Sequence, residues 1–474
     1  MTGIRTEPAR AGRNTDRGRL VLALVCASQF MVILDSAIVN VALPSVGAEL
    51  RFTPTGLAWV VNGYLLTFAG LMLLGGRVAD VVGPRRVLLA GLALFSAASL
   101  VGGLAPNPGV LVVARGAQGV GAALMAPATL AVINTGFPES RSRARAFGAW
   151  SAAGGIGGMA GALAGGVITT GLSWRWVFLV NVPIGVLLIA VAATSLPAVR
   201  PPGRPSLDLA GAITGTAGLA AVIHGVMRAA DHGWRSGWVV GPVAAGVLLL
   251  VAFTVVQARV AARPLVPLRL FAVRGVAVGT GMLVLFGGVA IAMWYFTSLL
   301  LQNVLGYSAL WAGLGQTPAA VAFLLVARAA AGLLPRLGAR RSILAGAALF
   351  LVGFGWLARA DAGTGYLPGV LGPTLLVAVG IGLVFPTVMA VTTADAPERD
   401  AGVVGGVATT ANQVGSSIGL AVLATVASAV SAADRHPSSP AALAAGYDRV
   451  FLAAAGLAVG IALLSVLLPR PTRD

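Results

Sequence analysis

Charged residues are scarce in this chain of 474 residues, and their scarcity excludes most classes of soluble protein. Only 10% of the residues are charged, whereas 57% are hydrophobic; soluble globular proteins carry about 25% charged residues. So few charges cannot cover a water-exposed surface of this size. Long apolar runs recur from Leu20 to Leu468, and they indicate helices embedded in a bilayer.

Lysine is absent, and all 32 basic residues are arginines. The net charge of +17 does not predict a nucleic-acid partner, because the arginines lie in short loops between apolar runs. No basic helix or RNA-binding motif accompanies them. The basic charge therefore marks the ends of membrane segments.

Cysteine is almost absent too, since Cys26 is the only one. A single cysteine excludes an intramolecular disulfide and a multi-cysteine metal site, and we expect no metal and no organic cofactor. The sequence also has no Walker-type phosphate loop and no nucleophile–base pair. Both absences argue against an ATP-driven pump and against an enzyme.

Fourteen apolar stretches are long enough to cross about 30 Å of hydrocarbon at about 1.5 Å per residue. The predicted fold class is therefore an all-α membrane protein with fourteen transmembrane helices. The arginine-rich segment 1–19 precedes a long apolar run, which favours a retained first span over a cleaved signal peptide. The predicted spans are 20–43, 56–76, 87–105, 110–135, 147–170, 175–197, 208–227, 238–258, 275–299, 312–334, 342–359, 368–393, 403–429 and 450–468.

The distribution of arginine predicts the orientation of these spans. With the N-terminus in the cytoplasm, most arginines fall in cytoplasmic segments, as the positive-inside rule requires. We therefore expect a multi-pass protein of the cell membrane with both termini in the cytoplasm. The exceptions are Arg115 and Arg328 within spans, and Arg51, Arg175, Arg228, Arg235, Arg359, Arg435 and Arg449 outside.

An internal repeat divides the chain. The loop Gly83-Pro84-Arg85-Arg86 recurs 255 residues later as Gly338-Ala339-Arg340-Arg341. Two six-helix halves alone need an offset of only about 200 residues, and the excess fits one inserted helix pair. Parallel halves of this kind are a transporter architecture, with the substrate site between them. The predicted regions are a tail at 1–19, a six-helix bundle at 20–197, the inserted pair with its loops at 198–274, a second bundle at 275–468 and a tail at 469–474.

Asp35 is the one acidic residue well inside a predicted span. A carboxylate in a bilayer is costly unless it faces water or a partner, and that cost favours reversible protonation. Arg115 falls in the same outer half of the membrane, where it can approach Asp35 and favour its charged form. We predict a proton-coupling role for the pair; a purely structural ion pair is the alternative.

Two further segments have predicted roles in movement rather than in chemistry. The segment after the second span is a short turn with the properties of a cytoplasmic gate, although its arginines also serve topology: Gly76, Arg77, Asp80, Gly83, Arg85 and Arg86. The fifth span has small residues at four-residue spacing, which let helices approach closely and slide or simply pack: Gly157, Gly161, Gly165 and Gly166.

Together these segments resemble the major facilitator superfamily, in particular its fourteen-span drug:proton antiporter branch. The stretch from Leu34 to Pro44 is similar to that branch's first-span signature, and the stretch from Gly76 to Arg86 is similar to the superfamily's cytoplasmic loop. The segment 115–123 resembles the fourth-span motif, whose arginine is implicated in proton transfer, and 173–185 resembles another stretch typical of the branch. The resemblance implies two six-helix bundles, two extra central helices and proton coupling at Asp35.

Two positions depart from the family pattern. Ala162 replaces a proline of the antiporter motif, which removes an expected kink and leaves export and import both open. Pro335 stands where Asp80 would recur in the second half, so the repeated gate segment is degenerate.

The predicted substrate site is a mostly apolar cavity with a few polar groups. Each candidate also has a plainer role, as a helix–helix hydrogen bond or an interfacial aromatic. His224 is expected to be structural, and Arg328 either snorkels to the surface or supplies a cavity charge. The candidates are Asn62, Tyr64, Gln118, Trp294, Tyr295, Gln316, Asn412 and Gln413.

The function predicted from these features is proton-coupled efflux of small amphipathic compounds such as drugs and antibiotics, by a monomer working through alternating access. Its partners are the substrate, protons and the lipid bilayer. A proton-coupled importer or facilitator of a small metabolite is the first alternative. A non-transporting membrane sensor or scaffold is the second.

Overall fold

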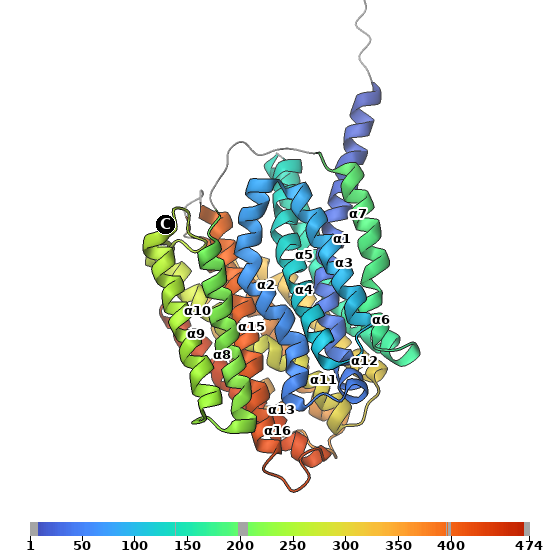
Figure 1. The fold of residues 1–474 in the computed structure, drawn as a ribbon, viewed down its shortest axis with the longest axis vertical. Coiled ribbons are helices and arrows are strands. Elements are labelled where there is room, and N and C mark those ends of the chain that lie inside the picture. Colours follow the sequence, from blue (N-terminus) through green and yellow to red (C-terminus); the bar gives the residue numbers. More distant parts are fainter. Residues whose placement is uncertain (1–7, 138, 198–206, 395, 397–399, 469–474) are drawn as a thin grey trace, which may run out of the picture.

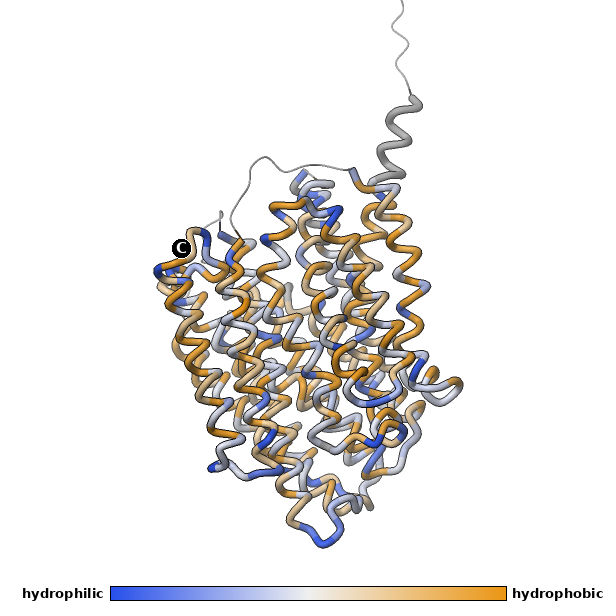
Figure 2. The backbone as a smooth tube through the Cα atoms, viewed as in Figure 1, coloured by the Kyte–Doolittle hydropathy of each residue, from blue (hydrophilic) through white to orange (hydrophobic). Residues whose placement is uncertain are grey.

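The computed structural model describes residues 8–137, 139–197, 207–394, 396 and 400–468. These residues form helices joined by short turns, with no β-strand in the described ranges. Fourteen of the described helices are long and apolar enough to cross a membrane, which confirms the predicted fold class and span count. Hydrophobic residues run along the lengths of the helices, and hydrophilic residues gather toward their ends (Figure 2).

The first half of the chain forms one bundle, the first bundle (Figure 1). Its helix starts follow local chemistry: the Thr53 side chain accepts from the Gly56 N–H, Asn107 caps in the same way, and a proline follows each of them. The helices are α1 (Pro8–Leu50), α2 (Pro54–Val82), α3 (Pro84–Gly103), α4 (Pro108–Gly136), α5 (Ser140–Gly171), α6 (Arg175–Leu179) and α7 (Asn181–Ser195).

Along the chain, two helices come between this bundle and the remaining helices. They are α8 (Leu209–His232) and α9 (Gly237–Val255), and α9 continues as η1 (Val256–Val260). They pack on each other, and α8 also packs on α2 and α15. The remaining helices form the second bundle. Its elements are η2 (Leu268–Ala272), α10 (Arg274–Ile291), η3 (Ala292–Phe296), α11 (Thr297–Leu299), η4 (Leu300–Val304), α12 (Ala309–Leu337), α13 (Ala339–Leu357), η5 (Leu367–Leu371), α14 (Gly372–Ala394), α15 (Ala401–Ser431) and α16 (Pro440–Val466).

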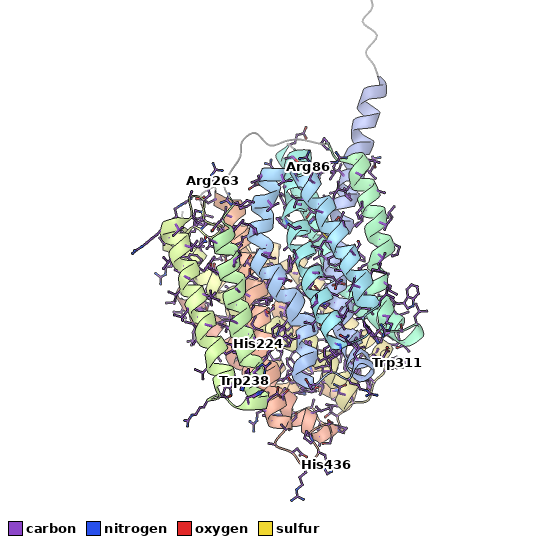
Figure 3. The ribbon with its side chains drawn as sticks, in the orientation of Figure 1. Arg86, His224, Trp238, Arg263, Trp311 and His436 are labelled. Atoms are coloured by element: carbon purple, nitrogen blue, oxygen red, sulfur yellow. The ribbon has the colours of Figure 1, made fainter. Side chains whose placement is uncertain are left out.

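The start of α1 and the end of α16 lie at the same end of the helical assembly, at the top of Figure 1. We call this the terminal end, and the other the opposite end. Arg86 and Arg263 lie toward the terminal end, whereas His436 projects from the opposite end (Figure 3). The two bundles meet mainly where α5 packs on α12 and α2 packs on α15.

The structure corrects two boundaries that bear on the site. The second helix continues to Val82, so Gly76 and Asp80 are helical and the turn is reduced to Gly83, whose φ of 100° suits a residue without a Cβ. The last helix begins at Pro440 rather than near residue 450, because Ser439 caps it. Asp448 therefore lies inside a spanning helix, and Asp35 is not alone there.

Candidate functional site

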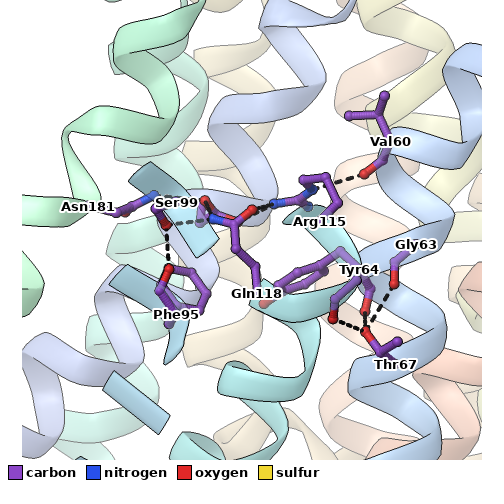
Figure 4. Close-up of polar contacts among 11 residues, drawn as sticks. Val60, Gly63, Tyr64, Thr67, Phe95, Ser99, Arg115, Gln118 and Asn181 are labelled. Carbon is purple, nitrogen blue, oxygen red and sulfur yellow. Dashed lines mark hydrogen bonds and ion pairs between the residues drawn. The ribbon is translucent and has the colours of Figure 1, made fainter. Parts of the chain in front are cut away.

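The carboxylate of Asp35 lies at the centre of a buried polar network between helices of the first bundle (Figure 4). Arg115 of α4 donates from Nη1 to Oδ2 of Asp35 at 2.5 Å. Gln118 and Asn181 both donate to the other oxygen, Oδ1, at 3.0 and 2.8 Å. The side chains of Asp35 and Arg115 are 0% and 1% exposed, so water does not compete for these bonds.

Arg115 is held on all sides by its own contacts. Its Nε donates to the backbone carbonyl of Val60 in α2 at 2.9 Å, and Nη1 also reaches the Gln118 side-chain oxygen at 3.0 Å. The guanidinium carbon lies 4.4 Å from the centre of the Tyr64 ring, a cation–π distance. These contacts offset part of the large cost of burying an arginine.

Sequence reasoning missed Ser99 and Asn181 as members of this site. Ser99 accepts from Gln118 Nε2 at 2.8 Å and so orients the amide that bonds Asp35. Asn181 is the first residue of α7, separated from α6 by Val180 alone. A lone amide in the apolar run 175–197 was the available signal, because a buried side-chain amide requires a partner.

The position of Asn181 is fixed from the opposite end of the bundle. Trp174, just before α6, donates to the Glu49 carboxylate at 2.7 Å, and Arg175 forms an ion pair with the same carboxylate at 2.9 Å. Arg175 also donates to the carbonyls of Gly103 and Ala105. This corner ties α6 to the ends of α1 and α3, and α7 continues directly from it.

The network combines one acid, one permanent cation and two neutral amides. Its donors address both oxygens of the Asp35 carboxylate, with Arg115 at Oδ2 and the two amides at Oδ1. These residues include no nucleophile–base pair of the kind that covalent catalysis requires.

The glycines of α5 allow α1 to approach closely beside Asp35. A Cβ at Gly161 would lie 2.8 Å from the Leu34 carbonyl and 2.7 Å from the Ala37 Cβ. Gly157 and Gly165 face the Phe30 and Ile38 carbonyls in the same way. Gly166 instead faces the second bundle, where a Cβ would lie 2.7 Å from the Ala309 carbonyl.

The predicted gate segment, residues 76–86, forms no ion pair among the described residues. Asp80 is exposed and, within the described part of the chain, makes no hydrogen bond or ion pair. Arg77 reaches the Pro264 carbonyl at 3.5 Å, and Arg85 donates to the Ala193 carbonyl at 2.6 Å. A cavity of about 700 Å³ adjoins Asp80 and Arg85, and all of its lining residues belong to the first bundle.

The predicted cavity residues do not share one location. Gln118 belongs to the Asp35 network, and Tyr64 stacks beside Arg115. Asn62 is fully buried where the bundles meet, accepting from Ser417 at 3.0 Å and contacting Met227. The other candidates lie in the second bundle: Tyr295 and Gln316 are buried, while Trp294, Asn412 and Gln413 are half-buried.

The two polar residues whose roles were left open have different surroundings. His224 of α8 accepts from Arg228 Nε at 3.1 Å, and its ring lies 6.1 Å from the Trp59 ring of α2. It is therefore part of the packing of the inserted pair, near Trp238 (Figure 3). Arg328 is exposed on α12, and neither of its two alternatives is decided by a contact.

Comparison with known proteins agrees with this geometry. Residues 25–420 match the family model described as Major Facilitator Superfamily. The chain is 44% identical to the cephamycin export protein CmcT of Amycolatopsis lactamdurans, over 100% of this chain and 97% of that protein. It is 40% identical to the puromycin resistance protein pur8 of Streptomyces alboniger, over 94% and 90% of the two chains. The lincomycin resistance protein of Streptomyces lincolnensis is 33% identical, over 89% and 88%.

Solved structures share the fold at low sequence identity. The nucleoside transporter NupG, in a mutant form, aligns with a TM-score of 0.65 at 13% identity, over 95% of this chain and 100% of that chain. A proton-dependent oligopeptide transporter aligns with a TM-score of 0.63 at 15% identity, over the same shares. The chain belongs to the major facilitator superfamily, a family of membrane transporters and not of enzymes, and its sequence relatives include antibiotic export and resistance proteins.

Proposed function

We propose that this protein exports small amphipathic compounds, antibiotics among them, in exchange for protons, and that it works as a monomer with its terminal end in the cytoplasm. The fully buried Asp35–Arg115 pair is the observation that supports proton coupling. The names of the relatives, which include a cephamycin exporter and two antibiotic resistance proteins, support outward transport.

Protonation of Asp35 changes the forces within the network. The ionised carboxylate accepts from Arg115, Gln118 and Asn181. The neutral acid attracts Arg115 much less, while Arg115 keeps its bonds to Val60 and Gln118. Proton uptake therefore loosens α1 from α4 and α7, and this loosening favours rocking of the bundles.

The contacts between the bundles support a resting state that is open toward the cytoplasm. The Leu310 backbone N–H donates to the Thr170 hydroxyl at 3.2 Å near the opposite end. Toward the terminal end, Asp80 makes no ion pair with the described residues, as expected of a disengaged cytoplasmic gate.

One proton supplies enough driving force for useful export. A membrane potential of about 100 mV contributes about 2.3 kcal/mol per charge moved, and one pH unit adds roughly 1.4 kcal/mol per proton. Together they sustain a substrate gradient of several hundredfold. The substrate binds between the bundles, with Trp294, Asn412 and Gln413 as the half-buried candidates for contacting it.

Proton-driven efflux from everted membrane vesicles tests the proposal. The wild-type protein should move a fluorescent amphiphile when a pH gradient is imposed, and Asp35→Asn should abolish that movement. Undiminished efflux by Asp35→Asn would refute the proton role. A host made more sensitive to toxic compounds by expression of the protein would instead indicate import.

A further inference from the structure

Proline inside the first helix leaves one backbone carbonyl without its helical partner. In an α-helix the N–H of residue 44 would bond to the carbonyl of residue 40, but Pro44 has no N–H. The Asn40 carbonyl therefore needs a donor from elsewhere, since an unsatisfied buried carbonyl is costly. This carbonyl lies five residues beyond Asp35 along the same helix, or roughly 7.5 Å.

The donor comes from the other bundle. The Ser298 hydroxyl donates to the Asn40 carbonyl at 3.1 Å, and Gln302 Nε2 donates to the next carbonyl, that of Val41, at 3.1 Å. Gln302 also bonds the Ser298 hydroxyl at 3.1 Å. The two side chains therefore form one unit that links the second bundle to the first.

The backbone around these two residues is irregular. Ser298 lies in α11, a short α-helical stretch between the π-helical segments η3 and η4, and Gln302 lies in η4. A π-helical turn changes the direction in which side chains project and is often found at functional sites. Here α11 contacts α1, and Ser298 of α11 and Gln302 of η4 both bond to the backbone of α1 just before Pro44.

We propose that Ser298 and Gln302 are gate residues that close the opposite end of the transporter. Ser298 binds the Asn40 carbonyl that Pro44 leaves free, and Gln302 binds the neighbouring carbonyl of Val41. The inference rests on the alternating-access function proposed above and names the contact that must break when the protein opens outward. Because the accepting carbonyls lie on α1 just beyond Asp35, a shift of α1 on protonation acts directly on the gate.

Opening of this gate can be measured as a change in the distance between spin labels on the two bundles. In a background with Cys26→Ser, we would attach spin labels at Leu104→Cys and His436→Cys, two exposed positions at the opposite end of the first and second bundles. Double electron–electron resonance in lipid nanodiscs then reports the open and closed populations. Ser298→Ala and Gln302→Ala should each raise the ratio of open to closed by roughly two- to tenfold, the effect of one hydrogen bond.

Pro44→Ala provides the decisive comparison. It restores the missing N–H, so the Asn40 carbonyl is satisfied within α1 and the Ser298 bond loses its advantage. Pro44→Ala should raise the open population, and the double variant Pro44→Ala/Ser298→Ala should go no further than the larger single effect. Independent, additive effects would overturn the proposal, as would unchanged distances in the Ser298 and Gln302 variants.

Pro127→Ala is the matched control. Pro127 is also inside a spanning helix, but the carbonyl it leaves free, that of Ala123, faces Gly75 within the same bundle. Its substitution should leave the label distances unchanged. The label distances are measured with neither substrate nor a proton gradient, so they test the gate separately from the proposed function. Retained efflux in Asp35→Asn would refute the proposed function and leave the label distances unchanged.

Discussion

Arg115 donates to Asp35 across the interface of α4 and α1, and both side chains are fully buried. A charge pair in such a place is rarely a net gain in stability, because desolvation of the two ions offsets their attraction. Removal of one partner is costly because the other charge is left buried and alone. Removing both charges should therefore cost less stability than removing one, while a function that needs the acid is lost in either case.

Neutralising the pair in two steps should therefore separate stability from transport. Arg115→Gln and Asp35→Asn should each cost about 3–5 kcal/mol of stability, whereas the double variant should recover much of this loss and still fail to couple transport to protons. Thermal unfolding in detergent, with proton-driven efflux alongside, would measure both. Recovery of proton-driven efflux in the double variant would contradict the role given to Asp35.

Loss of Asn181 should destabilise the Asp35 network. Asn181→Ala removes one of three donors to the carboxylate, and a hydrogen bond to a charged group contributes about 1.5–3 kcal/mol to stability. The unfolding temperature in detergent should therefore fall. Asn303→Ala, which removes an amide bonded to the neutral Tyr447 hydroxyl instead, should lower it less, and equal effects would contradict the special role of the bond to Asp35.

Close packing of α5 on α1 should make Gly161 intolerant of a side chain. Gly161→Ala places a methyl group against the Leu34 carbonyl and the Ala37 Cβ, and overpacking of this kind costs about 1–3 kcal/mol. Gly148→Ala in the same helix meets nothing within 4 Å and should be neutral or stabilising, since alanine is the better helix former. Unfolding temperatures of the two variants provide the comparison; equal destabilisation would contradict the close approach at Gly161.

Asp80 should affect turnover and not stability. It is exposed and, among the described residues, without an ion pair, so Asp80→Asn should change stability by less than about 0.5 kcal/mol. A gate role requires Asp80 to bind a partner in the outward-open state. Asp80→Asn weakens that bond, so the initial rate of efflux should fall. Asp231→Asn, an exposed acid at the opposite end, is the control and should preserve the rate. An unchanged rate in Asp80→Asn would remove Asp80 from the gate.

Much of the architecture follows from composition and periodicity. Spans are set by the thickness of a bilayer, so hydropathy alone predicted fourteen helices. Their ends were less predictable, because caps such as Ser439 and the continuation of α2 to Val82 depend on local backbone geometry rather than on mean hydropathy. A short polar start therefore hid nearly three turns of α16, and with them Asp448.

The sequence by itself determined the membrane fold, the buried acid and its expected neighbour Arg115, because a lone charge in an apolar run has few physical solutions. Only the tertiary structure decided which amides complete the site, since Ser99 and Asn181 come from helices distant in the chain and have no charge to mark them. The same holds for the carbonyl that Pro44 leaves free. The sequence shows that a donor is missing, but only the packing of the two bundles supplies Ser298 as its replacement.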